Sequence, residues 1–162
     1  MLRLFVDKGG DGHDDLFLKI DVMISHLKVA DSYFLYDFLE LNEANLQHID
    51  ADRHRSYAVT LLLDYWIDRI HKLEKGQQTF LLFDLSDQYI GGLMLEKVKR
   101  GYIMKDVYTT DLQGWGVSKS TLDEQISQSE AVFLEGSEKR EWLIGEEALF
   151  NGLTWSLDQL KM

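Results

Sequence analysis

Residues 52–73 read DRHRSYAVTLLLDYWIDRIHKL, and this stretch decides the fold. Its apolar side chains recur at steps of three and four, as on one face of an α-helix. The apolar stripe consists of Val59, Leu62, Leu63, Trp66, Ile67, Ile70 and Leu73. The opposite edge is polar, with Ser56, Thr60, Asp64, Asp68 and His71. The pattern predicts a long helix packed on a sheet, with Asp50 or Asp52 as N-cap and Gly76 at its end.

Strands are predicted on both sides of this helix. Residues 16–24 alternate large apolar residues with a second, more polar set, so they are expected to form one half-buried strand. After the helix comes a meander of apolar segments, two of which are joined by the polar turn at residues 99–101. In full, strands are expected at residues 2–6, 16–24, 79–85, 89–98, 102–110, 131–135 and 141–144.

Three further segments carry helical signals. Asp31 and Ser32 can cap a helix over residues 34–41, and Thr121 with Glu124 has the spacing of a capping box. The last segment is ambiguous. Its leucines fit a helix that begins near residue 146, whereas the pair Asn151-Gly152 is a hairpin signal. We favour the helix.

The order of these elements predicts an α+β fold. Strands grouped in hairpins, with helices between the groups, favour a mostly antiparallel sheet of about five strands. The helix at residues 52–73 is expected to pack on one face of that sheet, with further short helices around it. The sequence shows no linker, internal repeat or low-complexity segment, so residues 1–162 are expected to form one domain.

The charge balance narrows the choice of partners. The chain has 28 acidic and 17 basic residues, a formal net charge of −11. Nucleic acid and anionic membrane are disfavoured as partners, because both are bound through clustered Lys and Arg. A cationic protein is the natural electrostatic partner. The alternative is that the acidic charge serves only to keep the protein in solution.

Cysteine is absent, which fits a cytoplasmic protein, although a periplasmic protein without disulfides is an alternative. No apolar run approaches the ~20 residues that are needed to span a bilayer. Residues 1–6 are too short for the core of a signal peptide.

Acidic clusters are the only candidates for catalysis, because the common catalytic and nucleotide-binding motifs are missing. Asp11, His13, Asp14 and Asp15 could hold a divalent cation, but their spacing fails that of a calcium loop, and a Gly/Asp-rich turn explains them. Asp64, Asp68 and His71 share one helical face, where a solvated polar edge is the simpler interpretation. Residues 84–88 contain two carboxylates, which a hairpin turn also explains. We therefore expect no metal, no cofactor and no enzymatic activity.

Trp115 is the most distinctive aromatic residue, because the loop DLQGWG at residues 111–116 places it between two glycines. Such a residue either folds back on the core or serves as a binding anchor. We expect the core, by a small margin.

Three features of the sequence support a resemblance to a known class of proteins: the acidic excess, the strand–turn–strand segment FDLSDQYIG at residues 83–91 and the loop at Trp115. In these features the chain resembles the small acidic immunity proteins of bacterial toxin–immunity systems, including contact-dependent growth inhibition. The resemblance implies a non-enzymatic protein that neutralises a cognate cationic toxin, such as a nuclease, by covering its active site. A metal-dependent hydrolase that uses the Asp/His clusters, and an adaptor or scaffold subunit, are the alternatives.

On this interpretation, acidic residues around an aromatic anchor bind the toxin. Five of the expected contact residues lie in or beside the predicted meander, and two lie at the start of the last helix. They are Asp87, Tyr89, Asp106, Asp111, Trp115, Glu146 and Glu147.

Overall fold

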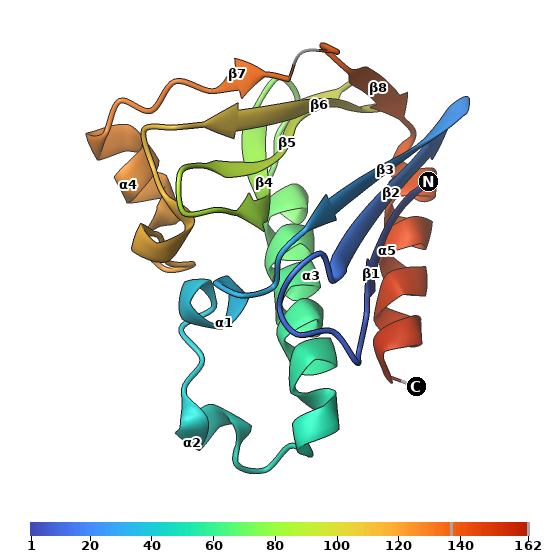
Figure 1. The fold of residues 1–162 in the computed structure, drawn as a ribbon. Coiled ribbons are helices and arrows are strands. Elements are labelled where there is room, and N and C mark those ends of the chain that lie inside the picture. Colours follow the sequence, from blue (N-terminus) through green and yellow to red (C-terminus); the bar gives the residue numbers. More distant parts are fainter. Residues whose placement is uncertain (137, 162) are drawn as a thin grey trace.

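A computed structural model of the chain describes residues 1–136 and 138–161 (Figure 1). The α+β class is confirmed, with the strands divided between two antiparallel sheets rather than gathered in one. A three-stranded sheet has the order β1-β2-β3, formed by Leu2–Val6, Leu16–Val22 and Ile24–Ala30. A five-stranded sheet contains Gln78–Leu85 (β4), Ile90–Val98 (β5), Gly101–Thr109 (β6), Leu134–Glu135 (β7) and Glu141–Ile144 (β8).

The first sheet differs from the sequence prediction at one turn. Residues 16–24 were expected to continue as one strand, but the chain reverses at Met23, where φ is +59°. Val22 and Ile24 then face each other as the first pair of the β2–β3 hairpin. The alternation of side chains continues through this turn, and no glycine or asparagine marks it. Residues 16–24 therefore have the pattern of a single strand although they belong to two.

The second sheet follows the predicted meander. β4, β5 and β6 pair as successive antiparallel hairpins, with an irregularity between Leu82 and Asp84. The far edge of β6 is shared by two short strands, since β7 pairs with Val107 and Tyr108, and β8 pairs with the earlier part of β6. β7 is only two residues long, shorter than the predicted strand at residues 131–135.

The long helix α3, His54–His71, connects the layers of the molecule. It contacts β1 of the first sheet, β4 of the second and the C-terminal helix α5, Glu146–Lys161. Its predicted stripe is buried, apart from Ile67, which is partly exposed. Ser56, predicted on the polar edge, is also buried, because the N-terminal part of α3 is covered on more sides than the stripe predicts.

The predicted ends of α3 are not capped as expected. Its N-cap position is Arg53, and no side chain caps it, because residues Ala51–Arg53 form a 3-10 turn (η1) that leads directly into the helix. The helix ends at His71, and Lys72 is its C-cap residue. Gly76 lies beyond it, at φ +84°, and donates its N–H to the carbonyl of Lys97.

Apart from α3 and α5, the helices are short. The short helices are Leu35–Phe38 (α1), Glu43–Leu46 (α2), the 3-10 turn Gly114–Gly116 (η2) and Leu122–Gln128 (α4). Asp31 and Ser32 do not cap α1, because both face the loop before β2 instead. The predicted capping box of α4 is also absent, because the Thr121 hydroxyl bonds to the side chains of Ser118 and Gln125. Among the described helices, none has both the length and the apolar character to cross a bilayer.

The C-terminal segment is a helix, as predicted, and its Gly152 has a packing role. A Cβ atom at this position would lie 2.1 Å from the carbonyl oxygen of Leu2. Glycine therefore allows α5 to lie against the outer edge of β1. One helical turn further along α5, the Ser156 hydroxyl accepts the N–H of Leu4 at 2.9 Å and donates to the Gly152 carbonyl. The pair Asn151-Gly152, which the sequence offered as a hairpin turn, thus lies within α5, where Gly152 permits close contact with β1.

The outer edge of β4 is closed in a similar way. The indole Nε1 of Trp66 on α3 donates a hydrogen bond of 3.0 Å to the carbonyl of Leu82. Both groups are buried, so the indole satisfies a carbonyl that would otherwise face the interior without a partner. In each sheet, a side chain of a helix therefore hydrogen-bonds to the backbone at one outer edge.

Candidate functional site

The two sheets meet at a trough that runs beside β3. It consists of two cavities, of about 750 and 320 Å³. Asp84 and Tyr89, at the β4–β5 hairpin, line both cavities and so join them into one feature. One wall is formed by the end of β3 and the residues after it, and the other by the β4–β5 hairpin and β6 (Figure 1). We call this feature the inter-sheet trough.

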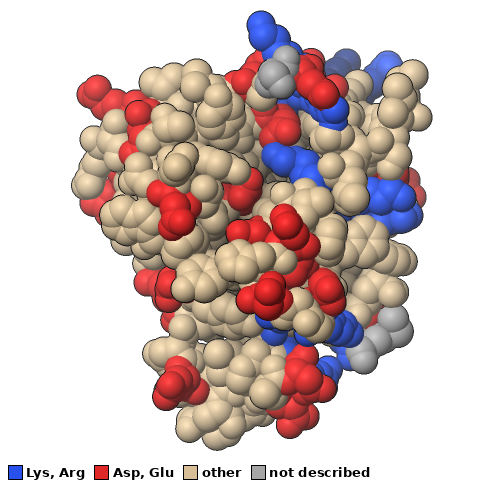
Figure 2. Space-filling model, viewed as in Figure 1, with Lys and Arg blue, Asp and Glu red and all other residues tan. Residues whose placement is uncertain are grey.

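Carboxylates dominate the trough. The larger cavity is lined by Asp14, Asp31, Asp84 and Asp87, and the smaller one adds Asp106. Figure 2 shows acidic side chains gathered at the centre of this face of the molecule. Because low-dielectric walls strengthen electrostatic interactions, carboxylates in a hollow attract a cation more strongly than carboxylates on an open surface.

Asp84 is the most desolvated of these groups. Burial raises the pKa of its carboxyl, although the hydrogen bond from the Tyr89 hydroxyl, at 2.9 Å, and the charge of Lys28 act in the opposite direction. Burial and the neighbouring carboxylate raise the pKa of Tyr89 to about 12, so the phenol stays protonated as a donor. A carboxyl whose charge is disfavoured by desolvation gains most from an incoming cation.

A second polar group lies at the entrance of the larger cavity. Asp31 accepts the backbone N–H of Asp14 at 2.7 Å and contacts the His13 ring nitrogen at 3.1 Å. Burial alone would raise the pKa of Asp31, but these two hydrogen bonds outweigh it and lower that pKa. The same contact raises the pKa of His13. The His13 ring also stacks on Tyr33, with 5.8 Å between ring centroids.

The smaller cavity contains the only lysine in the described lining of the trough. Lys28 of β3 forms an ion pair with Asp106 of β6 and so links the two sheets. Tyr89 and Tyr108 stand edge to face beside it, with 6.2 Å between ring centroids. The trough therefore combines carboxylates with tyrosine rings, which are the side chains enriched in binding anchors.

Asp15, a member of the candidate cation cluster that the sequence pattern explains as a turn, has a structural role. It is 1% exposed, accepts hydrogen bonds from the N–H and hydroxyl of Ser32, and pairs with Arg55 at 3.0 Å. These contacts fix the loop between β1 and β2 against α3. Within residues 1–136 and 138–161, no group of three or more His, Cys, Asp or Glu side chains is placed to hold a metal ion.

The second predicted cluster, on α3, lies outside the trough. Asp64 and Asp68 are exposed, and Asp68 pairs with Lys72 one turn further along. The His71 ring stacks on Phe150 of α5, with 4.7 Å between centroids. This arrangement is that of a solvated helix edge, as the sequence favoured. The turn at residues 84–88 is likewise a hairpin, closed by the N–H of Ser86 donating to Tyr89.

The structure brings together three of the seven predicted contact residues. Asp87, Tyr89 and Asp106 line the trough. Asp111 lies in the loop that follows β6, where its carboxylate accepts the N–H of Val132 at 2.8 Å. Glu146 and Glu147 are exposed in the first turn of α5 and do not line either cavity.

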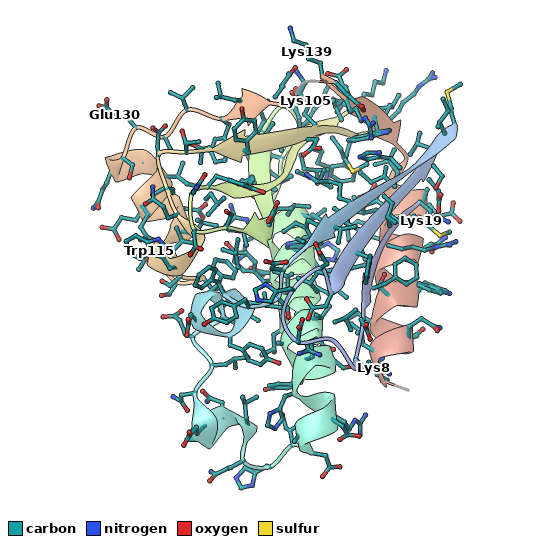
Figure 3. All side chains as sticks on the ribbon, in the orientation of Figure 1. Lys8, Lys19, Lys105, Trp115, Glu130 and Lys139 are labelled. Carbon is teal, nitrogen blue, oxygen red and sulfur yellow. The ribbon has the colours of Figure 1, made fainter. Side chains whose placement is uncertain are left out.

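Trp115 is exposed, so its expected burial in the core is wrong. Its side chain is 63% accessible because η2 is held by its backbone rather than by the indole. The N–H of Gly114 donates to the carbonyl of Ser86 at 2.7 Å, and a Cβ atom at Gly114 would clash with that same turn. Trp115 is thereby attached next to a residue that lines the larger cavity, and it lies at the rim of the molecule in Figure 3.

Sequence reasoning missed Asp31 and Lys28 as site residues. Asp31 was interpreted as a helix cap, and Lys28 belongs to a strand that the pattern did not separate from β2. His13, Asp14 and Asp84 were noticed, but as members of local turns. Only the pairing of β3 with β2 brings these residues beside the β4–β5 hairpin. The one signal in the sequence that pointed to this site was the acidic charge of the turns at residues 11–15 and 84–88.

Comparison with family models, with curated proteins and with solved structures gave no match for this chain.

Proposed function

We propose that this protein is a non-enzymatic binding protein that neutralises a cationic protein partner, in the manner of the bacterial immunity proteins it resembles. The observation that carries the proposal is the inter-sheet trough, which is lined by carboxylates and tyrosines from the segments that flank the first sheet and from the β4–β5 hairpin and β6. The partner would be a toxin domain that the protein meets in the cytoplasm. Binding would cover a cationic active site or substrate-binding surface of that toxin.

The electrostatics of the trough support this proposal. Asp31 and Asp87 offer negative charge in the lining of the larger cavity, in a chain with a net charge of −11. Such a field accelerates the encounter with a basic protein and disfavours nucleic acid. Tyr33, which lines the larger cavity, and Trp115, which follows the glycine bonded to Ser86, are both exposed and supply aromatic area for close contact.

Binding is a better interpretation than hydrolysis. The trough carboxylates are engaged by different partners, with His13 on Asp31, Tyr89 on Asp84 and Lys28 on Asp106. A hydrolase requires carboxylates that converge on one reacting atom or one metal. A lysine or arginine side chain, in contrast, can replace any one of these contacts.

The test is co-purification with the toxin domain of the protein encoded next to this one, followed by binding kinetics at two salt concentrations. Asp87→Lys should slow association by about tenfold at low salt, because it reverses a charge in the trough. The matched control is Asp64→Lys, which makes the same charge change on the exposed edge of α3. At physiological salt Asp64→Lys should have almost no effect on association, because charges beyond about 8 Å are screened there, whereas part of the effect of Asp87→Lys should remain.

Trp115→Ala tests the anchor at the rim of the trough. It should mainly accelerate dissociation and cost about 2 kcal/mol or more in binding. Equal effects of Asp87→Lys and Asp64→Lys, with Trp115→Ala silent, would place the binding surface elsewhere. Absence of binding to the toxin domain at micromolar concentration would refute the immunity function itself.

A further inference from the structure

β3 presents an unpaired strand edge to the trough, as the register of the first sheet shows. Asp21 donates its N–H to the Met1 carbonyl, and Asp7 donates to Asp15, both at 2.8 Å. In an antiparallel pair, residues alternate between those that hydrogen-bond to one neighbour and those that face the other. The odd-numbered residues of β2 therefore bond to β1, and its even-numbered residues bond to β3.

The consequence for β3 follows from its register with β2. The even-numbered residues of β2 pair with even-numbered residues of β3: Ile20 lies opposite His26, Leu18 opposite Lys28 and Leu16 opposite Ala30. The backbone N–H and C=O groups of Ser25, Leu27 and Val29 must then point away from β2. None of the hydrogen bonds among the described residues engages these six groups. They form a row of free donors and acceptors along the outer edge of β3, and this row enters the trough at Val29.

This edge lacks most of the features that keep strand edges from pairing. β3 is seven residues long, contains no proline and shows no bulge in its register with β2. Its one charged residue, Lys28, points inward, which alone would discourage an added strand. The ion pair with Asp106 neutralises that charge. Leu27 and Val29 are 53% and 42% exposed, so they offer apolar contact beside the free backbone groups.

The charge of the trough selects the occupant. A second copy of this chain would bring another net charge of −11 against the same carboxylates, so pairing of two β3 strands is opposed by repulsion. A segment with Lys or Arg on one face would instead place its cations toward Asp31, Asp84 and Asp87. Side chains of a strand alternate between its faces, so cations at every second position suit this arrangement.

We propose that β3 is extended by an added strand: an extended segment of the partner, with Lys or Arg at alternate positions, pairs with Ser25, Leu27 and Val29 and directs its cations into the inter-sheet trough. This inference rests on the proposed function and names the part of the partner that is recognised. The main-chain hydrogen bonds supply affinity, and the carboxylates supply the preference for a basic sequence. The intervening apolar side chains contact Leu27 and Val29.

The first experiment uses a synthetic peptide with the sequence acetyl-TKVKVKT-amide as the probe. The expected result is saturable binding that weakens as salt rises. Two control peptides separate the contributions of side chains and backbone. One has glutamate in place of lysine, and the other has its central backbone amides N-methylated. Both should bind at least about tenfold more weakly, because the first reverses the charge and the second removes the pairing hydrogen bonds.

The second experiment changes the strand edge itself. Leu27→Pro removes an outward N–H while it leaves the hydrogen bonds to β2 intact, since proline is tolerated where the N–H faces out of a sheet. It should weaken peptide binding by about tenfold or more, whereas the matched Leu27→Ala, which keeps the N–H, should weaken it by less than about threefold. Amide exchange should show new protection at residues 25, 27 and 29 in the complex.

Three results would overturn the inference: equal binding of the N-methylated peptide, an unchanged exchange rate at residues 25, 27 and 29 in the saturated complex, or dimerisation of the chain through β3. These outcomes are independent of the toxin experiment. If the toxin domain binds and Asp87→Lys weakens it, but Leu27→Pro does not, the added strand is wrong and the immunity function stands. If the peptide pairs with β3 but the toxin domain does not bind, the function is wrong and the strand site stands.

Discussion

The outer edges of β1 and β4 are closed by helices, whereas the outer edge of β3 is open. At β1, Gly152 allows α5 to approach closely and Ser156 accepts the Leu4 N–H. At β4, Trp66 donates to the Leu82 carbonyl. At β3, the equivalent backbone groups of Ser25, Leu27 and Val29 have no partner among the described residues.

This difference between the strand edges separates contacts that stabilise the fold from an edge at which another chain could bind. A closed edge satisfies buried backbone groups, whose exposure without a partner costs free energy. An open edge keeps its groups solvated and exposes a template for another chain. The open edge here is the one that adjoins the acidic trough. We infer that the fold covers the outer edges of β1 and β4 and leaves that of β3 for a partner.

The largest effect is expected where α5 meets β1. Gly152→Ala should lower the free energy of unfolding by about 3 kcal/mol, because the added Cβ would lie 2.1 Å from the Leu2 carbonyl oxygen. The loss should occur although alanine is the better helix former by about 1 kcal/mol. Urea denaturation measures it. The control is Gly116→Ala, where no atom lies within 4 Å of the added group. Equal stability of both variants would mean that α5 is not held closely against β1.

A pair of proline substitutions compares the two sides of β3. Lys28→Pro removes an N–H that bonds to β2, whereas Leu27→Pro removes one that faces the trough. Lys28→Pro should therefore cost about 2 kcal/mol more in unfolding free energy, after each value is corrected with the corresponding alanine variant. Thermal or urea unfolding gives the difference. If Leu27→Pro is the more damaging change, the register of the free groups is reversed.

Ser156→Ala tests the closed edge of β1 with a smaller change. The hydroxyl accepts the N–H of Leu4, and both residues are buried. Its loss leaves a buried donor unpaired, which should cost about 1–2 kcal/mol of unfolding free energy. Thr154→Ala, an exposed position on the same helix, should change this free energy by less than about 0.5 kcal/mol. A silent Ser156→Ala would indicate that β1 does not need this cover.

The smallest effect concerns Asp84 in the trough. Because burial raises the pKa of this carboxyl, its charge destabilises the folded protein at pH values above that pKa. Asp84→Asn should therefore raise the unfolding free energy slightly at neutral pH, and the gain should fade as acid protonates Asp84 in the parent protein. The same variant should bind the basic peptide less tightly. A loss of stability that is equal at all pH values would contradict this interpretation.

Much of the fold was predictable because it depends on local periodicity. The stripe of α3, the meander of β4 to β6 and the helix α5 all have patterns that the structure confirms. The division into two sheets was not predictable, since the turn at Met23 carries none of the residues that usually mark a reversal. The role of Gly152 also escaped, because a contact with Leu2 depends on tertiary packing.

The site was predictable only in part. Asp87, Tyr89 and Asp106 were named because they lie in one meander, and that meander forms one wall of the trough. The other wall comes from residues more than fifty positions earlier in the chain, so no local pattern could place Asp31 or Lys28 beside them. Exposure of Trp115 depends on how Gly114 fits against Ser86, which is again a tertiary contact.

The most direct test of the open edge is amide hydrogen exchange of the free protein, measured residue by residue by NMR. We expect an alternating pattern in β3, with fast exchange at residues 25, 27 and 29 and protection at residues 26, 28 and 30. The N–H of Leu4, covered by Ser156, should be protected like the sheet interior. Uniform protection along β3 would show that its outer edge is already covered and would contradict the account.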